Sequence, residues 1–115
     1  EKAKKEKFAI GACNVGNLET FKAIVQAAAA KKSPVIIESS PGETDWMGAD
    51  NMVDLAKNYS EEFNVPILVN LDHAEEYEDC EKAINAGYDL IHFDGSKKPL
   101  KENLVDLKKV GEEKK

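Results

Sequence analysis

The stretch PILVNLDHAEEYEDCEKAINAGYDLIHFDGS, residues 66–96, decides the fold. It begins with an apolar run, residues 66–73, that closes in Asp-His and is typical of a buried strand. Residues 77–86 follow as a predicted helix, and Gly87 supplies the usual C-terminal stop. A second apolar run, residues 89–96, is again typical of a strand. The stretch therefore predicts a strand–helix–strand unit, in which the helix crosses over between two parallel strands.

The same alternation of strand and helix covers the rest of the chain. Apolar residues between 18 and 32 recur at helical spacing, Asn17 stands at the N-cap position, and Ser33-Pro34 ends the helix. We expect the first seven residues to be a solvated, charged lead-in and residues 40–50 to be a long polar loop. The other predicted strands are residues 8–14 and 34–40, and the other predicted helices are residues 18–32, 51–63 and 103–110, the last breaking down from Gly111 onward.

Two architectures use four such strand–helix units: an open, doubly wound sheet, and part of a (β/α)8 barrel. Four units are half of what a barrel of about 250 residues requires. Polar residues at the C-terminal end of every strand are the barrel pattern, whereas an open sheet gathers its ligands at one switch point. We therefore predict a single domain, residues 1–115, with an α/β fold that is a parallel (βα)4 half of a TIM (β/α)8 barrel. The strand-end residues are Asn14, Ser40, Asp72, His73 and Asp94.

Composition excludes several classes of partner. The chain has 115 residues, of which 42% are hydrophobic and 33% charged, so it can bury a core. Its net charge of −6, with every basic residue a lysine, argues against binding to nucleic acid or to an anionic membrane. No apolar run approaches the roughly 20 residues of a membrane span. Two cysteines without a CxxC pair indicate a reducing, cytoplasmic setting, and the start at Glu1 rather than Met suggests a piece of something longer.

Asp72-His73 is the sharpest chemical signal in the chain. A histidine at a strand end is a natural zinc ligand, and an adjacent carboxylate can exchange protons beside the metal. The alternative is an aspartate that caps the next turn and a histidine with a structural hydrogen bond. Asp94 repeats the position one strand later but also fits an ordinary Asp-Gly turn. For His92, on the same strand face as Asp94, a role in the core is favoured over a role as a ligand.

The remaining candidates carry weaker signals. Asn14 and Ser40 can donate hydrogen bonds to a phosphate or a hydroxyl, although each also fits a cap or a turn. Cys13 is most simply a small buried residue. Trp46 and Met47 fit either a lid over the barrel mouth or an interface anchor.

Taken together, three segments resemble the N-terminal half of a class II, zinc-dependent ketose-bisphosphate aldolase. The fructose- and tagatose-bisphosphate enzymes represent this family. The matching segments run in family order across most of the chain, and this order makes the resemblance specific. They are FAIGACNVGNLETFKAIVQAA (8–28), KKSPVIIESSPG (31–42) and VPILVNLDHAEEYEDCEKAINAGYDLIHFDGSKKPLKENL (65–104).

The resemblance implies a role for each strand-end residue. His73 would be the first zinc ligand, and Asp72 the acid/base that exchanges a proton with the C4 hydroxyl of the substrate. Asn14 and Ser40 would hold the phosphorylated sugar, with Ser40 at the phosphate end, and Asp94 would lie near the metal and take a second cation. Zinc would act as a Lewis acid on the C2 carbonyl and stabilise the enediolate of dihydroxyacetone phosphate. The second product would be glyceraldehyde 3-phosphate.

The sequence departs from the family mainly in length. Asn70 and Glu38 stand where histidine and glutamine or an apolar residue are commoner, but neither touches the implied zinc site. The family's other zinc-binding histidines, its Gly-rich phosphate loops and its phosphate-binding arginine lie on the second half of the barrel, which this sequence does not include. We therefore expect the chain to self-associate or to pair with a C-terminal half-barrel. The alternative is a non-catalytic half-barrel that self-associates or opens into a flavodoxin-like sheet.

Overall fold

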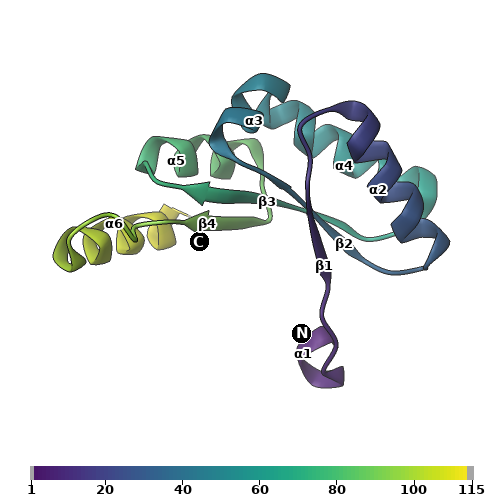
Figure 1. Ribbon diagram of the computed structural model, residues 1–115, viewed down its shortest axis with the longest axis horizontal. Coiled ribbons are helices and arrows are strands. Elements are labelled where there is room, and N and C mark those ends of the chain that lie inside the picture. The colour runs from purple at the N-terminus through teal and green to yellow at the C-terminus, as the bar shows by residue number, and fades with distance from the viewer. Residues whose placement is uncertain (1, 114–115) are drawn as a thin grey trace.

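A computed structural model describes residues 2–113 and contains one sheet of four strands, flanked by helices (Figure 1). The strands are ordered β1-β2-β3-β4, and every neighbouring pair is parallel. The elements in chain order are α1 (Lys2–Glu6), β1 (Gly11–Asn14), α2 (Leu18–Ala30), β2 (Val35–Ser39), α3 (Pro41–Met47), α4 (Ala49–Phe63), β3 (Ile67–Ala74), α5 (Tyr77–Ala86), β4 (Leu90–Phe93) and α6 (Leu100–Glu113).

The strand order confirms the predicted half-barrel. Each strand pairs with the next strand in the sequence, so the sheet has no point at which the order reverses. A doubly wound sheet, including a flavodoxin-like one, requires such a switch point. The flavodoxin-like alternative is therefore wrong for this chain.

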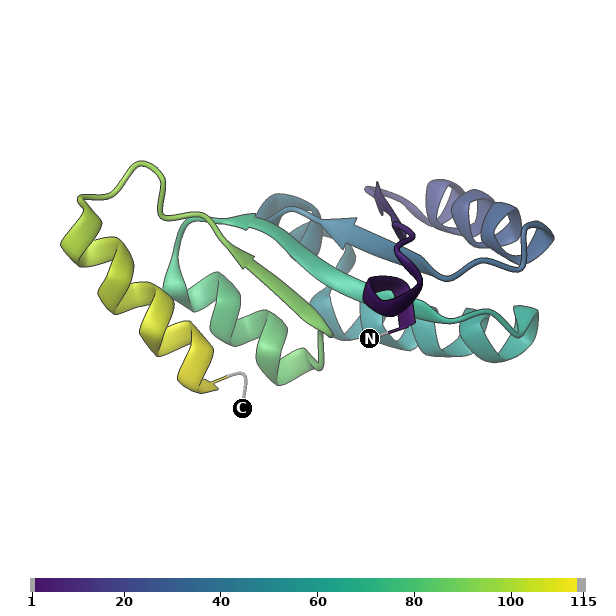
Figure 2. The same ribbon diagram turned by 90° about the horizontal axis from the view of Figure 1, so that it is seen from below.

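The two faces of the sheet have different surroundings. Helices α2 to α5 lie on one face, and none of the helices within residues 2–113 lies over the strands on the opposite face (Figures 1 and 2). Along β2, Val35, Ile37 and Ser39 are buried, whereas Ile36 and Glu38 are only partly buried. Because side chains alternate along a strand, the first set faces the helices and the second faces the uncovered side.

The core lies between the sheet and the helices. Phe21 and Val25 of α2 and Met52 of α4 are almost fully buried there, beside Ile37 and Leu71 of the central strands. Burying a large apolar side chain contributes about 1.5–3 kcal/mol. The helical face of the sheet therefore carries the stability of the fold and leaves the other face available for polar side chains.

Three expected irregular segments are helical instead. The predicted polar loop contains α3, because Ser40 caps it, Glu43 completes a capping box and Pro41 occupies the first turn. The predicted lead-in contains the short helix α1, which buries no residue. The last helix passes Gly111 and runs to Glu113, since a single glycine costs a helix only about 1 kcal/mol.

Apolar side chains remain exposed at the two ends of the sheet. Strands β1 and β4 each pair on one side only within residues 2–113. The most exposed large apolar residues of α6, which packs against α5, are Leu100, Leu104, Val105 and Leu107. None of the helices over residues 2–113 has the length and the apolar character to cross a membrane.

Candidate functional site

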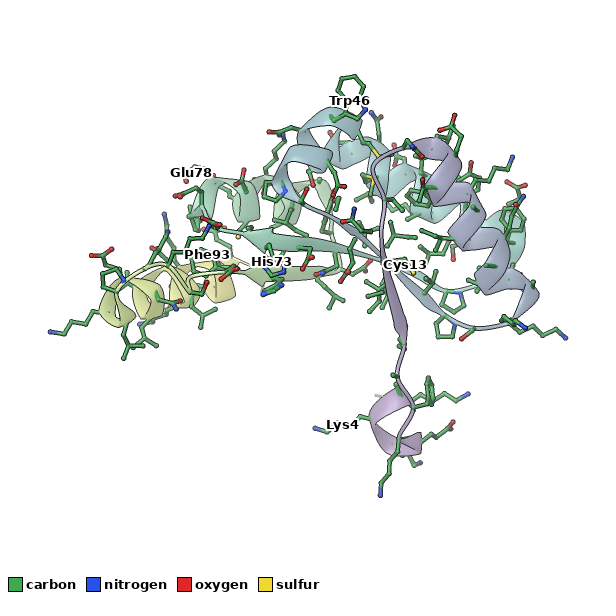
Figure 3. All side chains as sticks on the ribbon, viewed as in Figure 1. Lys4, Cys13, Trp46, His73, Glu78 and Phe93 are labelled. Carbon is green, nitrogen blue, oxygen red and sulfur yellow. The ribbon has the colours of Figure 1, made fainter. Side chains whose placement is uncertain are left out.

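The C-terminal end of β3 is irregular, and this irregularity builds the site. The pairing of β3 with β4 shifts register between Leu71 and Ala74, and His73 has a positive φ of 52°. A histidine in this left-handed region is uncommon and costs of order 1 kcal/mol or more. The turn brings two neighbouring side chains to one place, with Nε2 of His73 3.9 Å from Oδ2 of Asp72. Figure 3 shows His73 on the side of the sheet away from α3 and α5.

His73 is held by the carboxylate of Asp94. Its Nδ1 lies 2.9 Å from Oδ2 of Asp94, and Oδ1 of Asp94 accepts the backbone N–H of Ser96 at 3.0 Å. Hydrogen bonds from Ser96 and His73 hold the pKa of the Asp94 carboxyl well below its usual range. The hydrogen bond to Asp94, followed by the charge of Asp72, raises the pKa of His73 above its ordinary value. The pair therefore orients the ring and leaves Nε2 on the Asp72 side.

His92 also belongs to this cluster, and within residues 2–113 it is not a buried core residue. Its side chain is 48% exposed, and its Nδ1 lies 2.9 Å from Oδ1 of Asp72. The rings of His73 and His92 are 4.5 Å apart between centroids. Leu71 of β3 pairs with Ile91 of β4, and this register places Asp72 beside His92. The sequence contains no signal for that neighbourhood, because it depends on how the two strands pair.

Asp72, His73 and His92 together offer a possible metal site. One ligand atom from each of them lies within 4.8 Å of the others. Imidazole nitrogens and carboxylate oxygens are the ligands that zinc takes in proteins along with thiolates. The side chains of all three are partly or fully exposed, so an ion can reach them from solvent.

Asn14 and Ser40 are joined by a residue that the sequence analysis missed. Oε1 of Glu43 accepts a hydrogen bond from Nδ2 of Asn14 at 2.6 Å, and Oε2 accepts the backbone N–H and the hydroxyl of Ser40 at 2.8 and 2.9 Å. Partial burial opposes ionisation of Glu43, but these hydrogen bonds outweigh it, so the pKa of Glu43 lies below its ordinary value. The Ser-x-x-Glu spacing of a capping box was the available signal.

A buried group of hydroxyls lies beneath this second cluster. The hydroxyl of Ser39 is 2.8 Å from that of Thr44 and 3.1 Å from that of Tyr88, and all three residues are buried. These contacts tie the end of β2 to α3 and to the residues that enter β4. Because buried polar groups are costly unless they are paired, the group fixes the position of α3.

Other predicted residues lie apart from these contacts. Trp46 is 83% exposed and points away from His73, so it does not cover the cluster of Asp72, His73 and His92 (Figure 3). Cys13 is partly exposed rather than buried. On the uncovered face, Nδ2 of Asn70 donates to Oε1 of Glu38 at 3.0 Å, so the two departures from the family pattern pair with each other.

The structure thus divides the predicted residues into two clusters. Asp72, His73 and Asp94 meet at the ends of β3 and β4. Asn14 and Ser40 meet at the ends of β1 and β2 through Glu43. The charge of Asp72 opposes the ionisation of Glu43 but does not outweigh its hydrogen bonds, so the clusters influence each other electrostatically.

Comparison with known proteins places this geometry in one family. The family model "Fructose-bisphosphate aldolase class-II" matches residues 1–114. A Bacillus subtilis (strain 168) protein described as "Probable fructose-bisphosphate aldolase" is 41% identical over 113 residues, which are 96% of this chain and 40% of that protein. The D-tagatose-1,6-bisphosphate aldolase subunit GatY of Klebsiella oxytoca is 35% identical over 111 residues, 96% of this chain and 39% of that subunit.

Solved structures agree with the sequence relatives. The crystal structure of a fructose-bisphosphate aldolase from Campylobacter jejuni matches with a TM-score of 0.82 and 26% identity, covering 92% of this chain and 38% of that one. The chain spans about 40% of the length of the curated relatives that it matches. Its four strands accordingly correspond to about half of a (β/α)8 barrel.

Proposed function

The chain belongs to the class II fructose-bisphosphate aldolase family, and on that premise we propose that it supplies the metal-binding and proton-exchanging part of an aldolase site. The proposed reaction is zinc-dependent, reversible cleavage of fructose 1,6-bisphosphate or tagatose 1,6-bisphosphate. Its products are dihydroxyacetone phosphate and glyceraldehyde 3-phosphate. Relatives described as fructose- and tagatose-bisphosphate aldolases support both substrates.

The observation that carries this proposal is the backbone of His73. Its φ of 52° and the adjacent register shift end the apolar strand β3 in two neighbouring polar side chains, the partly exposed Asp72 and the exposed His73. Strained backbone persists only where the surrounding structure over-determines it, and it clusters at functional sites. Here the strain has a specific effect, because it brings Asp72 to the same side as His73.

The residues at this end of β3 fit a zinc ion. We assign His73 as a ligand through Nε2, because Nδ1 is engaged with Asp94. A bound zinc ion would supply a Lewis acid for the substrate carbonyl. The role of Asp94 as a ligand to a second cation stays a prediction; its hydrogen bond to His73 supports an orienting role in addition.

Asp72 is the residue that we assign to proton exchange at the C4 hydroxyl. Its carboxylate lies 3.9 Å from Nε2 of His73, so a hydroxyl placed beside that nitrogen is also near the carboxylate. His92 lies 2.9 Å from the other oxygen of Asp72 and holds the carboxyl group in place. The carboxylate therefore keeps one oxygen for the substrate.

We assign the phosphorylated sugar to the cluster of Asn14 and Ser40. Both residues carry donors at the carboxyl ends of neighbouring strands, where barrels bind their substrates. Glu43 accepts hydrogen bonds from both residues, so a substrate group that uses these donors has to replace the carboxylate of Glu43. Exchange of Glu43 for the substrate is thus a step that this chain imposes on binding.

Catalysis in this proposal requires further strand–helix units. The chain spans about 40% of its relatives, and zinc in catalytic sites normally takes three protein ligands. The uncovered sheet face and the unpaired sides of β1 and β4 suit four additional units, which complete an eight-stranded barrel. We propose a C-terminal half-barrel as that partner, with a second copy of this chain as the alternative. Free Cys13 and Cys80 support a reducing, cytoplasmic setting.

A chimera tests the proposed activity. Residues 1–114 replace the matching part of the Bacillus subtilis relative, and cleavage of fructose 1,6-bisphosphate is measured with zinc and after chelation. We expect chelator-sensitive cleavage that falls by about 10²–10⁴-fold in Asp72→Asn, because the proton-exchanging carboxylate is lost. The matched control is Asp54→Asn, an exposed aspartate on α4.

The same assay on the unmodified chain separates the two partners. Cleavage by the chain alone, together with a dimeric mass in light scattering, would favour self-association. A folded but inactive Asp72→Asn chimera supports the assignment. Full activity in Asp72→Asn, or full activity after complete zinc removal, would contradict the proposal.

A further inference from the structure

The two histidines of the chain are held in the same way. Nδ1 of His73 lies 2.9 Å from Oδ2 of Asp94, and Nδ1 of His92 lies 2.9 Å from Oδ1 of Asp72. Each imidazole therefore has a carboxylate as the partner of the same ring nitrogen. With both carboxylates ionised, each Nδ1 carries the hydrogen and donates it. In both neutral rings Nε2 is then the nitrogen with a free lone pair.

This arrangement is the one that metal-binding histidines adopt. A ligating histidine almost always donates its other ring N–H to a carboxylate or a carbonyl, which selects the tautomer and orients the ring. A histidine that serves only as a hydrogen-bonding residue has no need of a neighbouring imidazole. Here the ring centroids of the two histidines are 4.5 Å apart.

We propose that His92 is a second imidazole ligand, next to His73, for one divalent transition-metal ion, with Asp72 beside them. The class of ion is one that accepts imidazole together with carboxylate, such as Zn²⁺ or Co²⁺. The proposal deepens the metal role assigned above to His73 and rests on it. It adds a ligand from β4, so this chain supplies more than one of the ligands to the ion.

The geometry and the charge of the cluster suit a cation. One ligand atom from each of Asp72, His73 and His92 lies within 4.8 Å of the others. Ligands at about 2.0–2.2 Å from a tetrahedral zinc ion lie about 3.3 Å apart, so the side chains need to close by about 1.5 Å. His73 and His92 are 63% and 48% exposed and have room to move. The carboxylates around His73, including that of Glu38, create a negative field that attracts a cation.

The position of the ligands also favours binding. Asp72 and His73 lie in β3, at its register shift, and His92 lies in β4, so strand residues rather than loop residues carry all three groups. Sites on strands keep their geometry better than sites on loops. The sheet face on which the cluster lies is uncovered by helices, so the ion enters directly from solvent (Figures 1 and 3).

Metal binding by the chain itself tests the proposal, and it does not depend on catalysis. The chain is freed of metal and titrated with Co²⁺, and the visible absorption of the bound ion reports affinity, stoichiometry and coordination. We expect one ion per monomer and a loss of more than about 10-fold in affinity in His92→Gln. The matched control, Leu90→Ala, changes the same strand two residues earlier and should retain the affinity. Far-UV circular dichroism establishes whether each variant is folded. If His92→Gln does not fold, His92→Asn replaces it in the titration.

Three outcomes would overturn the proposal. The first is that the chain binds no Co²⁺, and the second is that His92→Gln binds Co²⁺ with unchanged affinity. The third is a stoichiometry of one ion per two chains together with a dimeric mass, which would mean that the site is shared between two copies. The proposed function can fail independently. An inactive chimera together with His92-dependent Co²⁺ binding would refute the proposed aldolase function and still support His92 as a metal ligand. An active chimera together with His92-independent Co²⁺ binding would support the aldolase function and refute His92 as a ligand.

Discussion

The two clusters on the carboxyl ends of the strands differ in what they leave open. At β3 and β4, the positive φ of His73 brings its side chain beside Asp72. Nε2 of His73 lies 3.9 Å from Oδ2 of Asp72, which is too far for a hydrogen bond. At β1 and β2, Glu43 accepts hydrogen bonds from Asn14 and Ser40, so these donors are already in use. The first cluster leaves Nε2 of His73 open to a ligand, whereas the second has to exchange an existing hydrogen-bond partner for one.

The difference follows from how each cluster is built. The first depends on the pairing of two strands and includes two histidines, each with a carboxylate neighbour. The second is a local capping box whose carboxylate reaches across to the neighbouring strand. A tertiary arrangement can hold groups in an incompletely paired state, because the surrounding strands provide the stability. A local cap forms only when its own donors and acceptors are paired.

Of the substitutions that distinguish the two clusters, Asp94→Asn should have the largest effect, and it acts on the affinity of the first cluster for Co²⁺. The change removes the charged partner of the His73 ring, so the ring loses its fixed orientation and the affinity for Co²⁺ should fall by about 10–100-fold. The Co²⁺ titration of the isolated chain measures this. Asp45→Asn is the control, because it also removes one negative charge but from an exposed residue of α3 that pairs with Lys82. Equal losses in the two variants would mean that net charge alone sets the affinity.

Tyr88→Phe should destabilise the support of the second cluster. The change removes a buried hydroxyl that lies 3.1 Å from that of Ser39, and we expect the free energy of unfolding to fall by about 1–2 kcal/mol. Urea unfolding followed by circular dichroism measures the change. Tyr59→Phe is the control, since its ring contacts with Phe21 and Phe63 survive the loss of the hydroxyl. Co²⁺ affinity should stay unchanged, and a parallel loss would show that the clusters are mechanically coupled.

Glu43→Gln should have the smallest effect, and the effect should depend on pH. Hydrogen bonds outweigh burial and hold the pKa of Glu43 below its ordinary value of 4.5. A carboxyl group with a lowered pKa stabilises the fold above its unfolded-state pKa, and this contribution is lost as the pH falls through the folded-state pKa. Glu43→Gln should therefore cost about 0.5–1 kcal/mol at pH 7 and close to nothing at strongly acidic pH.

The same urea titrations, run across that pH range, measure the contribution of Glu43. Glu19→Gln, in the first turn of α2, is the matched control. A cost that persists unchanged at acidic pH would mean that the charge of Glu43 is not what stabilises the cap.

Most of the fold could be predicted because it rests on local patterns. The helix over residues 77–86 was predicted with the bounds that it has as α5, since Gly87 ends it in a left-handed conformation. Three of the four strands were predicted too long, and the prediction over residues 66–73 is offset by one residue from β3, because an apolar run does not show where pairing starts and stops. The helix α3 was missed although Ser40, Pro41 and Glu43 carry its signature, because the polar composition of the segment was given more weight than its cap.

The candidate site was predictable only in part. Asp72, His73 and Asp94 were selected because polar residues at the ends of apolar strands are unusual, and the structure brings the three together. His92 and Glu43 were not selected. His92 becomes a neighbour of Asp72 through the register of β3 and β4. Glu43 reaches Asn14 only because parallel pairing sets β1 beside β2.

The sequence by itself determined the alternation of four strands with helices and the strand ends that carry chemistry, because propensity and periodicity act over a few neighbouring residues. The tertiary structure alone decided which strand-end groups meet. Hydrogen bonds between residues 20 or more positions apart, such as that between His92 and Asp72, exist only once the strands have paired. The positive φ of His73 has the same origin, since this conformation is uncommon for a non-glycine residue and the surrounding sheet holds it.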